Sequence, residues 1–198
     1  WGLGTSSTLL AALARWAKVD PYRILANTLG GSGYDLACAY AEGPVFYHVE
    51  NAVPSVEPVD FSPAFADQLF FVFLGKKQNS RLGIAHYRAL PGKTRAEIEE
   101  VSQLTRRFTA ATTLPEFEQV IAEHETFVQQ KLDLPKVREG LFPDYWGEIK
   151  SLGAWGGDFV LVTSNRSLAE TQTFFNEKGY PVFIPYAEMT VSPPHLSF

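Results

Sequence analysis

The sequence predicts an α+β fold in two parts, and three observations lead to this prediction. Near its start the chain has an alanine-rich stretch with apolar residues at helical spacing. Apolar runs at residues 68–75, 159–162 and 182–186 predict strands, and Ser/Thr-x-x-Glu sequences mark helix starts between them. The resulting β-α-α-β, β-α-β order over residues 68 to 186 fits a ferredoxin-like second domain.

Length, composition and charge exclude several classes of protein. With 198 residues and 45% apolar content, the chain can bury a core of one domain or of two small ones. Its net charge of −5 gives no basic footprint for nucleic acid. A single cysteine, Cys38, excludes an internal disulfide, and no apolar run reaches the length of a membrane span. We therefore expect a cytoplasmic protein that binds neither nucleic acid nor membrane.

A glycine- and hydroxyl-rich stretch precedes the first helix. Such a loop can bind an anion, because the first N–H groups of the helix are free and its dipole favours negative charge. The stretch lacks the Gly-Lys-Ser/Thr ending of a Walker loop, and an ordinary helix cap is the alternative. The residues of the predicted phosphate loop are Gly2, Leu3, Gly4, Thr5, Ser6 and Ser7. The buried face predicted for the helix comprises Leu9, Leu10, Leu13, Trp16 and Ala17.

Two further helices are predicted before the first strand. Asp20-Pro21 gives the N-cap and first position of a short helix that closes at Gly30-Gly31. The next helix begins near Gly33 and runs to Gly43, which puts Asp35 in its first turn. A carboxylate there could accept the proton of a hydroxyl, and Ser32 and Gly33 would let a substrate approach the backbone. The alternative is an ordinary acidic residue in a first turn.

The middle of the chain contains a predicted domain boundary. Residues 44–50 predict a strand, and the proline-rich segment that follows to Pro63 is expected to be irregular. We place the boundary near Pro63. The strand at residues 68–75 ends in a polar segment in which Lys76, Lys77 and Ser80 could contact an anionic group, with a solvated turn as the alternative.

The second half is mainly helical before its late glycines. Capping boxes at Thr94/Glu97 and Thr113/Glu116 predict helices over about 95–111 and 115–132. Their expected core positions are Phe108, Phe117, Val120, Ile121 and Phe127. His86 and His124 lack metal-ligand spacing to each other or to Cys38. The late stretch Ser-Leu-Gly-Ala-Trp-Gly-Gly-Asp predicts either a tight turn or a second anion loop, formed by Gly153, Ala154, Gly156 and Gly157. A capped helix from Ser167 follows the strand at 159–162.

Three segments together resemble the GHMP kinases, the family of galactokinase, homoserine kinase, mevalonate kinase and phosphomevalonate kinase. GLGTSST is similar to the family's phosphate loop, GGSGYD to the segment with the catalytic aspartate, and GAWGGD to its second glycine-rich loop. The likeness is strongest to the mevalonate and phosphomevalonate kinase branch. It implies that residues 1–63 are the C-terminal part of the ATP-binding domain and residues 64–198 the ferredoxin-like domain. It also implies an N-terminal segment before Trp1.

The resemblance implies an ATP-dependent kinase that phosphorylates a small metabolite. Asp35 would be catalytic, the first loop would hold the phosphates, and Ser6 would contact Mg²⁺. Lys76, Lys77 and Ser80 correspond to a polar loop that lies near the active site in mevalonate-type kinases. The acceptor is expected to be mevalonate or a phosphomevalonate-like alcohol of isoprenoid biosynthesis.

Two residues depart from the pattern of the GHMP kinases. Trp155 stands where the family usually has glycine, and Ile24 stands where the mevalonate kinase branch has a magnesium-binding glutamate. The phosphomevalonate kinase branch also lacks that glutamate.

The alternatives are a diphosphomevalonate decarboxylase-like enzyme, a catalytically silent nucleotide- or metabolite-binding module of the same fold, and an unrelated protein with structural loops. The oligomeric state is open, with a homodimer as one alternative. The family would place the phosphate loop, Asp35 and the late glycine loop in one cleft between the two domains.

Overall fold

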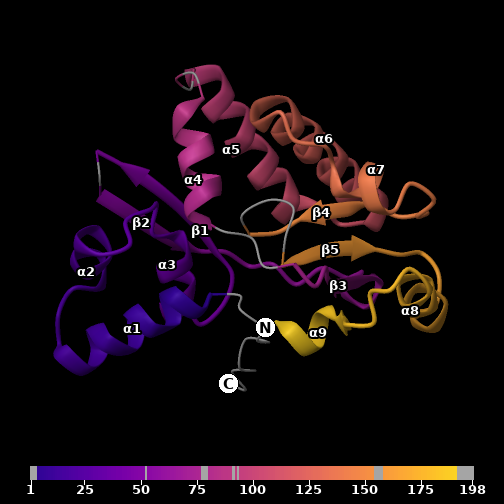
Figure 1. Cartoon of the computed structure of the whole chain (residues 1–198), viewed down its shortest axis with the longest axis horizontal. Helices are drawn as coiled ribbons and strands as arrows, with labels where there is room; N and C mark the ends of the chain where they lie inside the picture. The colour runs from indigo at the N-terminus through magenta and orange to yellow at the C-terminus, as the bar shows by residue number, and fades with distance from the viewer. Residues whose placement is uncertain are drawn as a thin grey trace. The chain divides into compact units, whose positions relative to one another are not determined.

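The computed structural model describes residues 4–51, 53–76, 80–90, 92, 94–153 and 158–190, without the side chains of residues 80, 81, 82 and 84. The described chain divides into two compact units, residues 4–61 and 62–190. Figure 1 shows a mixture of helices and strands in both units, which confirms the α+β class. The assignment of residues 1–63 and 64–198 to the two domains of a kinase stays a prediction.

The first unit consists of three helices and a two-stranded antiparallel sheet. Its elements are α1 Thr5–Ala17, α2 Pro21–Asn27, α3 Tyr34–Tyr40, β1 Val45–Glu50 and β2 Val53–Pro58. The start of α2 is as predicted, because the Asp20 side chain accepts the N–H of Tyr22 and Pro21 occupies the first turn. The Gly30 N–H donates to the Leu25 carbonyl and closes the helix.

Strand β2 corrects the prediction of an irregular segment between the first strand and Pro63. It pairs with β1 from Val45↔Pro58 to Glu50↔Val53. Val59 donates its N–H to the Pro44 carbonyl, directly before β1. Because only alternate residues of an antiparallel strand direct their backbone N–H toward a given neighbour, the nitrogens of Pro58 and Pro54 face the outer edge of β2. Proline is tolerated at these positions, because no backbone N–H is required for pairing on the outer edge. The prolines indicated a break in regular structure, and the sheet accommodates them at its edge instead.

The buried face of α1 also differs from the prediction. Leu10 is buried as expected, but Leu9, Leu13 and Trp16 are exposed, and Ala17 is not buried. The buried stripe is Ser7, Leu10, Ala11 and Ala14, and it meets Leu36 of α3. Small side chains occupy this stripe because the neighbouring helix approaches closely, whereas spacing alone favoured the larger residues.

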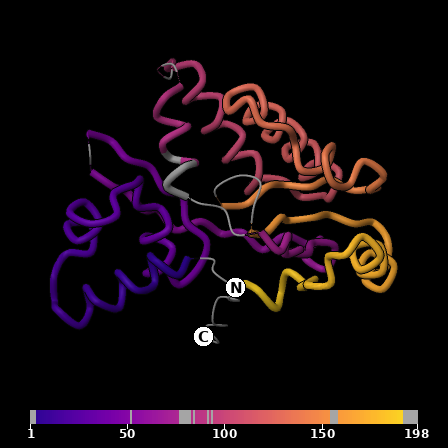
Figure 2. The backbone as a smooth tube through the Cα atoms, viewed as in Figure 1, coloured from indigo at the N-terminus to yellow at the C-terminus, as the bar shows by residue number. Residues whose placement is uncertain are grey.

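The second unit is built around a four-stranded antiparallel sheet with the order β4-β5-β3-β6. Its strands are β3 Leu69–Phe73, β4 Ile149–Ser151, β5 Phe159–Thr163 and β6 Phe183–Pro185. Its longer helices are α4 Ser80–Ala89, α5 Arg95–Ala110, α6 Leu114–Leu132 and α8 Leu168–Glu177. Short helical segments are η1 Ala66–Gln68, α7 Val137–Leu141 and α9 Tyr186–Met189. Figure 2 follows the chain through this order.

Both faces of this sheet are covered. Figure 1 shows α5 and α6 over one face and α8 on the opposite side. All five residues of β5 are buried, which explains why its sequence is a continuous apolar run and does not alternate. On the α8 side, Phe70, Val160 and Val162 pack with Phe175 and Phe142 in one core cluster.

The capping boxes predicted for α5 and α6 are present, and a third at Ser167 and Glu170 opens α8. Of the expected core positions, Phe117, Val120 and Ile121 are buried, and Phe108 and Phe127 are half-buried. Elements α4, α7, β4 and α9 were not predicted from the sequence. The last strand is shorter than predicted, because Tyr186 begins α9. Within the described ranges, no helix combines the length and apolar character needed to cross a bilayer.

Candidate functional site

The N-terminus of α1 begins at a left-handed glycine. Gly4 is the N-cap with φ of 67°, a backbone conformation that L side chains rarely adopt. Thr8 donates the first intrahelical N–H bond, to the Gly4 carbonyl at 2.9 Å. No described side chain caps this end of the helix. Within the described residues, the N–H groups of the first turn, from Thr5 to Ser7, have no partner in the helix and could bind a ligand.

The hydroxyl groups of this turn are not equivalent. Ser7 is buried, and its hydroxyl donates to the Gly4 carbonyl at 2.8 Å, so it stabilises the turn from inside. Thr5 and Ser6 are exposed. Both of these residues thus present a hydroxyl that could bind a metal or phosphate, and Ser6 is the one that the family resemblance assigns to the metal, while Ser7 contributes its backbone.

The N-terminus of α3 also begins at a left-handed glycine, Gly33, with φ of 87°. A methyl group there would lie 3.0 Å from the Tyr22 ring and 3.0 Å from the Tyr47 hydroxyl. The same Tyr47 hydroxyl donates to the Ser32 carbonyl. Tyrosines from α2 and β1 therefore hold the turn just before Asp35. Neither tyrosine stands out in the sequence, and only their contacts in the fold reveal this role.

Asp35 lies in the first turn of α3, as predicted. The residue is exposed, yet the protein atoms around its carboxyl partly desolvate it and raise its pKa. A hydrogen bond with the Tyr34 hydroxyl acts in the opposite direction. Partial desolvation, followed by the charge of Asp35, raises the pKa of Tyr34 to about 12. A raised carboxyl pKa moves Asp35 toward the range that suits a general base.

The two helix starts belong to one unit and point the same way. Leu10 and Ala11 of α1 form an apolar cluster with Leu36 of α3. Further along both helices, the Tyr40 hydroxyl donates to the Ala11 carbonyl at 3.1 Å, and the Arg15 guanidinium lies 4.7 Å from the centre of the Tyr40 ring. Leu36, near the start of α3, thus meets Leu10 and Ala11, whereas Tyr40, at the end of α3, meets Ala11 and Arg15, so the two helices run in the same direction. The free amides of α1 and the carboxylate of Asp35 therefore lie toward the same end of the helix pair.

In the second unit, the late glycine loop connects β4 to β5. Leu152 donates its N–H to the Phe159 carbonyl at 3.2 Å on one side of the loop. On the other side, Asp158 donates its N–H to the Lys76 carbonyl at 2.7 Å and accepts the Leu74 N–H at 2.7 Å. The structure thus brings Lys76, at the end of β3, next to the late loop, and Lys76 is exposed.

Several predicted residues lie outside the described part of the chain: Gly2, Leu3, Lys77, Ala154, Trp155, Gly156 and Gly157, and the side chain of Ser80. Gly153 is described, and it has a left-handed φ of 66°. The late loop and Asp35 belong to different units. Their meeting in one cleft stays a prediction.

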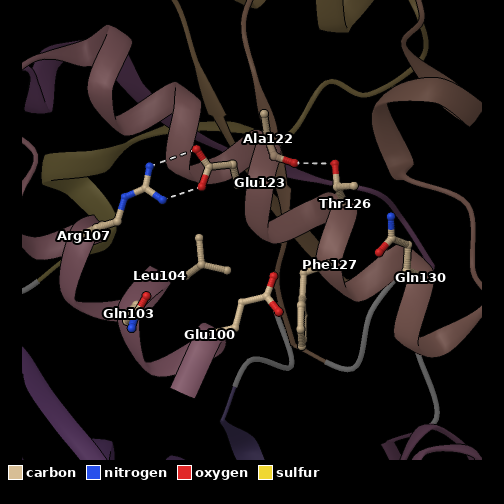
Figure 3. Close-up of a pocket in the computed structure, with 9 residues that line it drawn as sticks. All are labelled: Glu100, Gln103, Leu104, Arg107, Ala122, Glu123, Thr126, Phe127 and Gln130. Atoms are coloured by element: carbon tan, nitrogen blue, oxygen red, sulfur yellow. Dashed lines mark hydrogen bonds and ion pairs between the residues drawn. The ribbon is translucent and has the colours of Figure 1, made fainter. Parts of the chain in front are cut away.

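A hollow of about 470 Å³ lies between α5 and α6, and none of the predicted site residues lines it. Figure 3 shows Leu104 and Phe127 in its wall and the Arg107–Glu123 ion pair at its edge. Both charged side chains are already paired with each other. The hollow therefore offers no free counter-charge from this pair to a phosphate or carboxylate.

The described residues contain no group of three or more His, Cys, Asp or Glu side chains placed to hold a metal ion. Magnesium in phosphoryl-transfer sites typically keeps waters and phosphate oxygens, with one or two carboxylates or, in phosphate loops, a Ser/Thr hydroxyl from the protein. The exposed Ser6 hydroxyl beside free amides fits such a sparse donor set.

Comparison with solved structures finds a likeness of fold to the mevalonate kinase of L. major, solved in complex with R-mevalonate. The TM-score is 0.57 at 16% sequence identity, and the match covers 89% of this chain and 61% of that one. The chain therefore spans less than two thirds of that kinase. No protein-family model matches the chain, and no curated protein sequence matches it. At this identity, the likeness establishes the fold and leaves the activity to be tested.

Proposed function

We propose that this chain is part of an ATP-dependent kinase of the GHMP type that phosphorylates a hydroxyl of a small metabolite. The observation that carries the proposal is the pair of helix starts in the first unit, where free amides of α1 and the carboxylate of Asp35 lie toward the same end. Phosphoryl transfer needs both a cradle for the phosphates and a group that orients the attacking hydroxyl. The fold likeness to mevalonate kinase also supports a kinase function.

The roles of the residues follow from their surroundings. The amides from Thr5 to Ser7 would bind the β- and γ-phosphates, where the helix dipole favours negative charge. Ser6 would hold Mg²⁺ together with phosphate oxygens, and the ion would neutralise charge that develops during transfer. Asp35 would orient the acceptor hydroxyl and take its proton.

The second unit supports the finer assignment of the fold. Strand β5 lies between β3 and β4, and β3 lies between β5 and β6, so each strand-helix-strand unit has another strand inserted in it. This is the split arrangement of a ferredoxin-like domain. In a kinase of this type, the late glycine loop and Lys76 would face the phosphates or the substrate, and the acceptor would be mevalonate or a phosphomevalonate-like alcohol.

The test is ADP release from MgATP by the protein that contains this chain, with mevalonate, phosphomevalonate, homoserine and sugars as acceptors. Asp35→Asn keeps the size of the side chain but removes its charge, so turnover should fall by about a hundred- to ten-thousand-fold, with little change in ATP affinity. Asp20→Asn is the matched control, because Asp20 is an acidic residue at another helix start in the same unit, where it caps α2. Turnover in Asp35→Asn within about twofold of the parent would remove Asp35 from the mechanism.

The remaining alternatives give different results in the same assay. Release of carbon dioxide together with ADP would identify a decarboxylase of the same fold. ATP binding without turnover on any acceptor would identify a silent binding module. MgATP should raise the melting temperature by mass action, and Gly4→Val should abolish that shift, because a β-branched residue is strained at the φ of Gly4. A full shift in Gly4→Val would mean that the nucleotide binds elsewhere.

A further inference from the structure

A buried carboxylate lies beside the entrance to the late glycine loop. Glu125, on α6, is only 2% exposed. Carboxylates are rarely buried to this degree unless hydrogen bonds compensate for the lost hydration. Here both oxygens of Glu125 are used on one residue: Oε1 accepts the N–H of Ser151 at 3.2 Å, and Oε2 accepts its hydroxyl at 3.1 Å.

Ser151 occupies a position where the sheet cannot satisfy its N–H. It is the last residue of β4, which is an edge strand. Leu152 donates to Phe159 across the hairpin, and alternate N–H groups of an antiparallel strand point in opposite directions, so the Ser151 N–H points away from β5. Glu125 accepts the bond that a further strand would otherwise accept. The next two residues, Leu152 and Gly153, lead into the late loop.

Two basic residues lie near the Glu125 carboxyl group. His124 Nδ1 lies 3.7 Å from Glu125 Oε1. The neighbouring Lys150 is desolvated, which lowers its pKa, while the charge of Glu125 acts to keep it protonated. A hydrogen bond to a charged group contributes more than a neutral one, and its loss leaves the buried donors of Ser151 unpaired.

We propose that Glu125 is a positioning residue, which fixes the edge of β4 at Ser151 and thereby sets the entrance of the late glycine loop for binding of the phosphate donor. The proposal rests on the proposed function for its second half only. The first half concerns the local stability of β4 and holds for any function of the loop.

The same helix provides a matched control. Glu118 lies two turns before Glu125 on α6 and also bonds to a strand, since it accepts the Thr163 hydroxyl at 2.6 Å. Thr163 is at the end of β5 away from the late loop. Removal of Glu118 should therefore destabilise the unit without an effect at the loop entrance.

The first measurement is amide hydrogen exchange at Ser151 and Leu152, far below the melting temperature. Glu125→Leu should accelerate exchange of these two amides by about ten- to hundredfold, because a charge-assisted hydrogen bond is lost. Glu125→Gln should stay within about threefold of the parent, since its amide group can still accept the N–H and donate to the hydroxyl. Equal acceleration in Glu118→Leu, or none in Glu125→Leu, would overturn the proposal.

The second measurement is the separation of KM for MgATP from kcat in the protein that contains this chain. Glu125→Leu should raise KM by about tenfold, with Gln restoring it and Glu118→Leu leaving it unchanged. Ser151→Ala removes one donor and should give an intermediate rise, which keeps the test decisive if Glu125→Leu does not fold. Faster exchange with an unchanged KM would overturn the link to phosphate binding. A parent protein without turnover would instead refute the proposed function, while the exchange data still decide the positioning role.

Discussion

The two compact units use their apolar side chains differently. The second unit buries both faces of its sheet, and its main core cluster joins strands, α7 and α8. In the first unit, the cluster of buried residues is small and consists of Leu10, Ala11 and Leu36. Ten of the fourteen exposed large apolar side chains in the described part of the chain belong to this first unit. Backbone turns and tyrosine contacts, more than a large core, therefore hold the first unit.

This difference matches the roles proposed for the two units. A ligand that contacts backbone N–H groups needs open helix starts, which α1 and α3 provide at left-handed glycines. A stable sheet, in contrast, can hold a loop at its edge with little rearrangement. We expect the first unit to be less stable and more responsive to ligand than the second.

The largest expected effect concerns the core of the second unit. Phe175 is fully buried, and its ring centre lies 5.1 Å from that of Phe142 and 5.0 Å from that of Tyr145. Phe175→Ala should lower the free energy of unfolding by about 3–5 kcal/mol, because a cavity replaces the ring. Denaturant unfolding checks this. Leu168→Ala, exposed on the same helix, is the control. An unchanged free energy of unfolding in Phe175→Ala would contradict the packing described for this core.

The next effect concerns the turn before Asp35. Gly33→Ala should destabilise the first unit by about 1–3 kcal/mol, because its φ is left-handed and the new methyl group presses on Tyr22 and Tyr47. Gly43→Ala has open space and no such φ, so it should have little effect. Thermal unfolding of both variants measures the difference. Equal stability of the two variants would show that the turn is not held as described.

A fall in pH should destabilise the start of α5 in the second unit but not the start of α3 in the first unit. A hydrogen bond with Lys131, with help from Thr94, lowers the pKa of Glu97 to about 2. This contribution to stability is present above the ordinary pKa of 4.5 and is lost as the pH falls toward 2. Desolvation raises the pKa of Asp35, so protonation favours the folded state there, and acid should not weaken the start of α3.

Amide exchange between pH 6 and pH 3 at the starts of α5 and α3 measures this contrast. Glu97→Gln is the control, and it should remove the pH dependence at α5. Greater acid sensitivity at α3 than at α5 would contradict the assignment of these shifts. We expect a smaller effect than for the core variants, because exposed groups are screened by solvent.

The smallest effect is expected at the exposed face of α1. Trp16 is 84% exposed, so Trp16→Gln should change the free energy of unfolding by no more than about 0.5 kcal/mol. Ala14, 2% exposed on the same helix, is the contrast: Ala14→Leu should cost about 1–3 kcal/mol through overpacking. Chemical denaturation compares the two variants. A large loss in Trp16→Gln would mean that another surface covers this face.

Local features of the sequence were sufficient for the helix starts and for much of the candidate site. A capping box needs only residues three apart, so Thr94, Thr113 and Ser167 could be placed without knowledge of the fold. Gly4, Gly33 and Asp35 were likewise expected at helix starts, and the structure places them there.

Tertiary structure decided the features whose partners are distant in the chain. The sequence favoured Leu13 and Trp16 as the buried side of α1, but close approach of α3 selected small residues. Strand β2 pairs with β1 through alternate residues, which leaves Pro54 and Pro58 on its outer edge, where no N–H is needed. Ser151 meets Glu125 across 26 residues of sequence. Periodicity and capping depend on neighbours within a helical turn, whereas packing and edge hydrogen bonds depend on which segments the folded chain brings together.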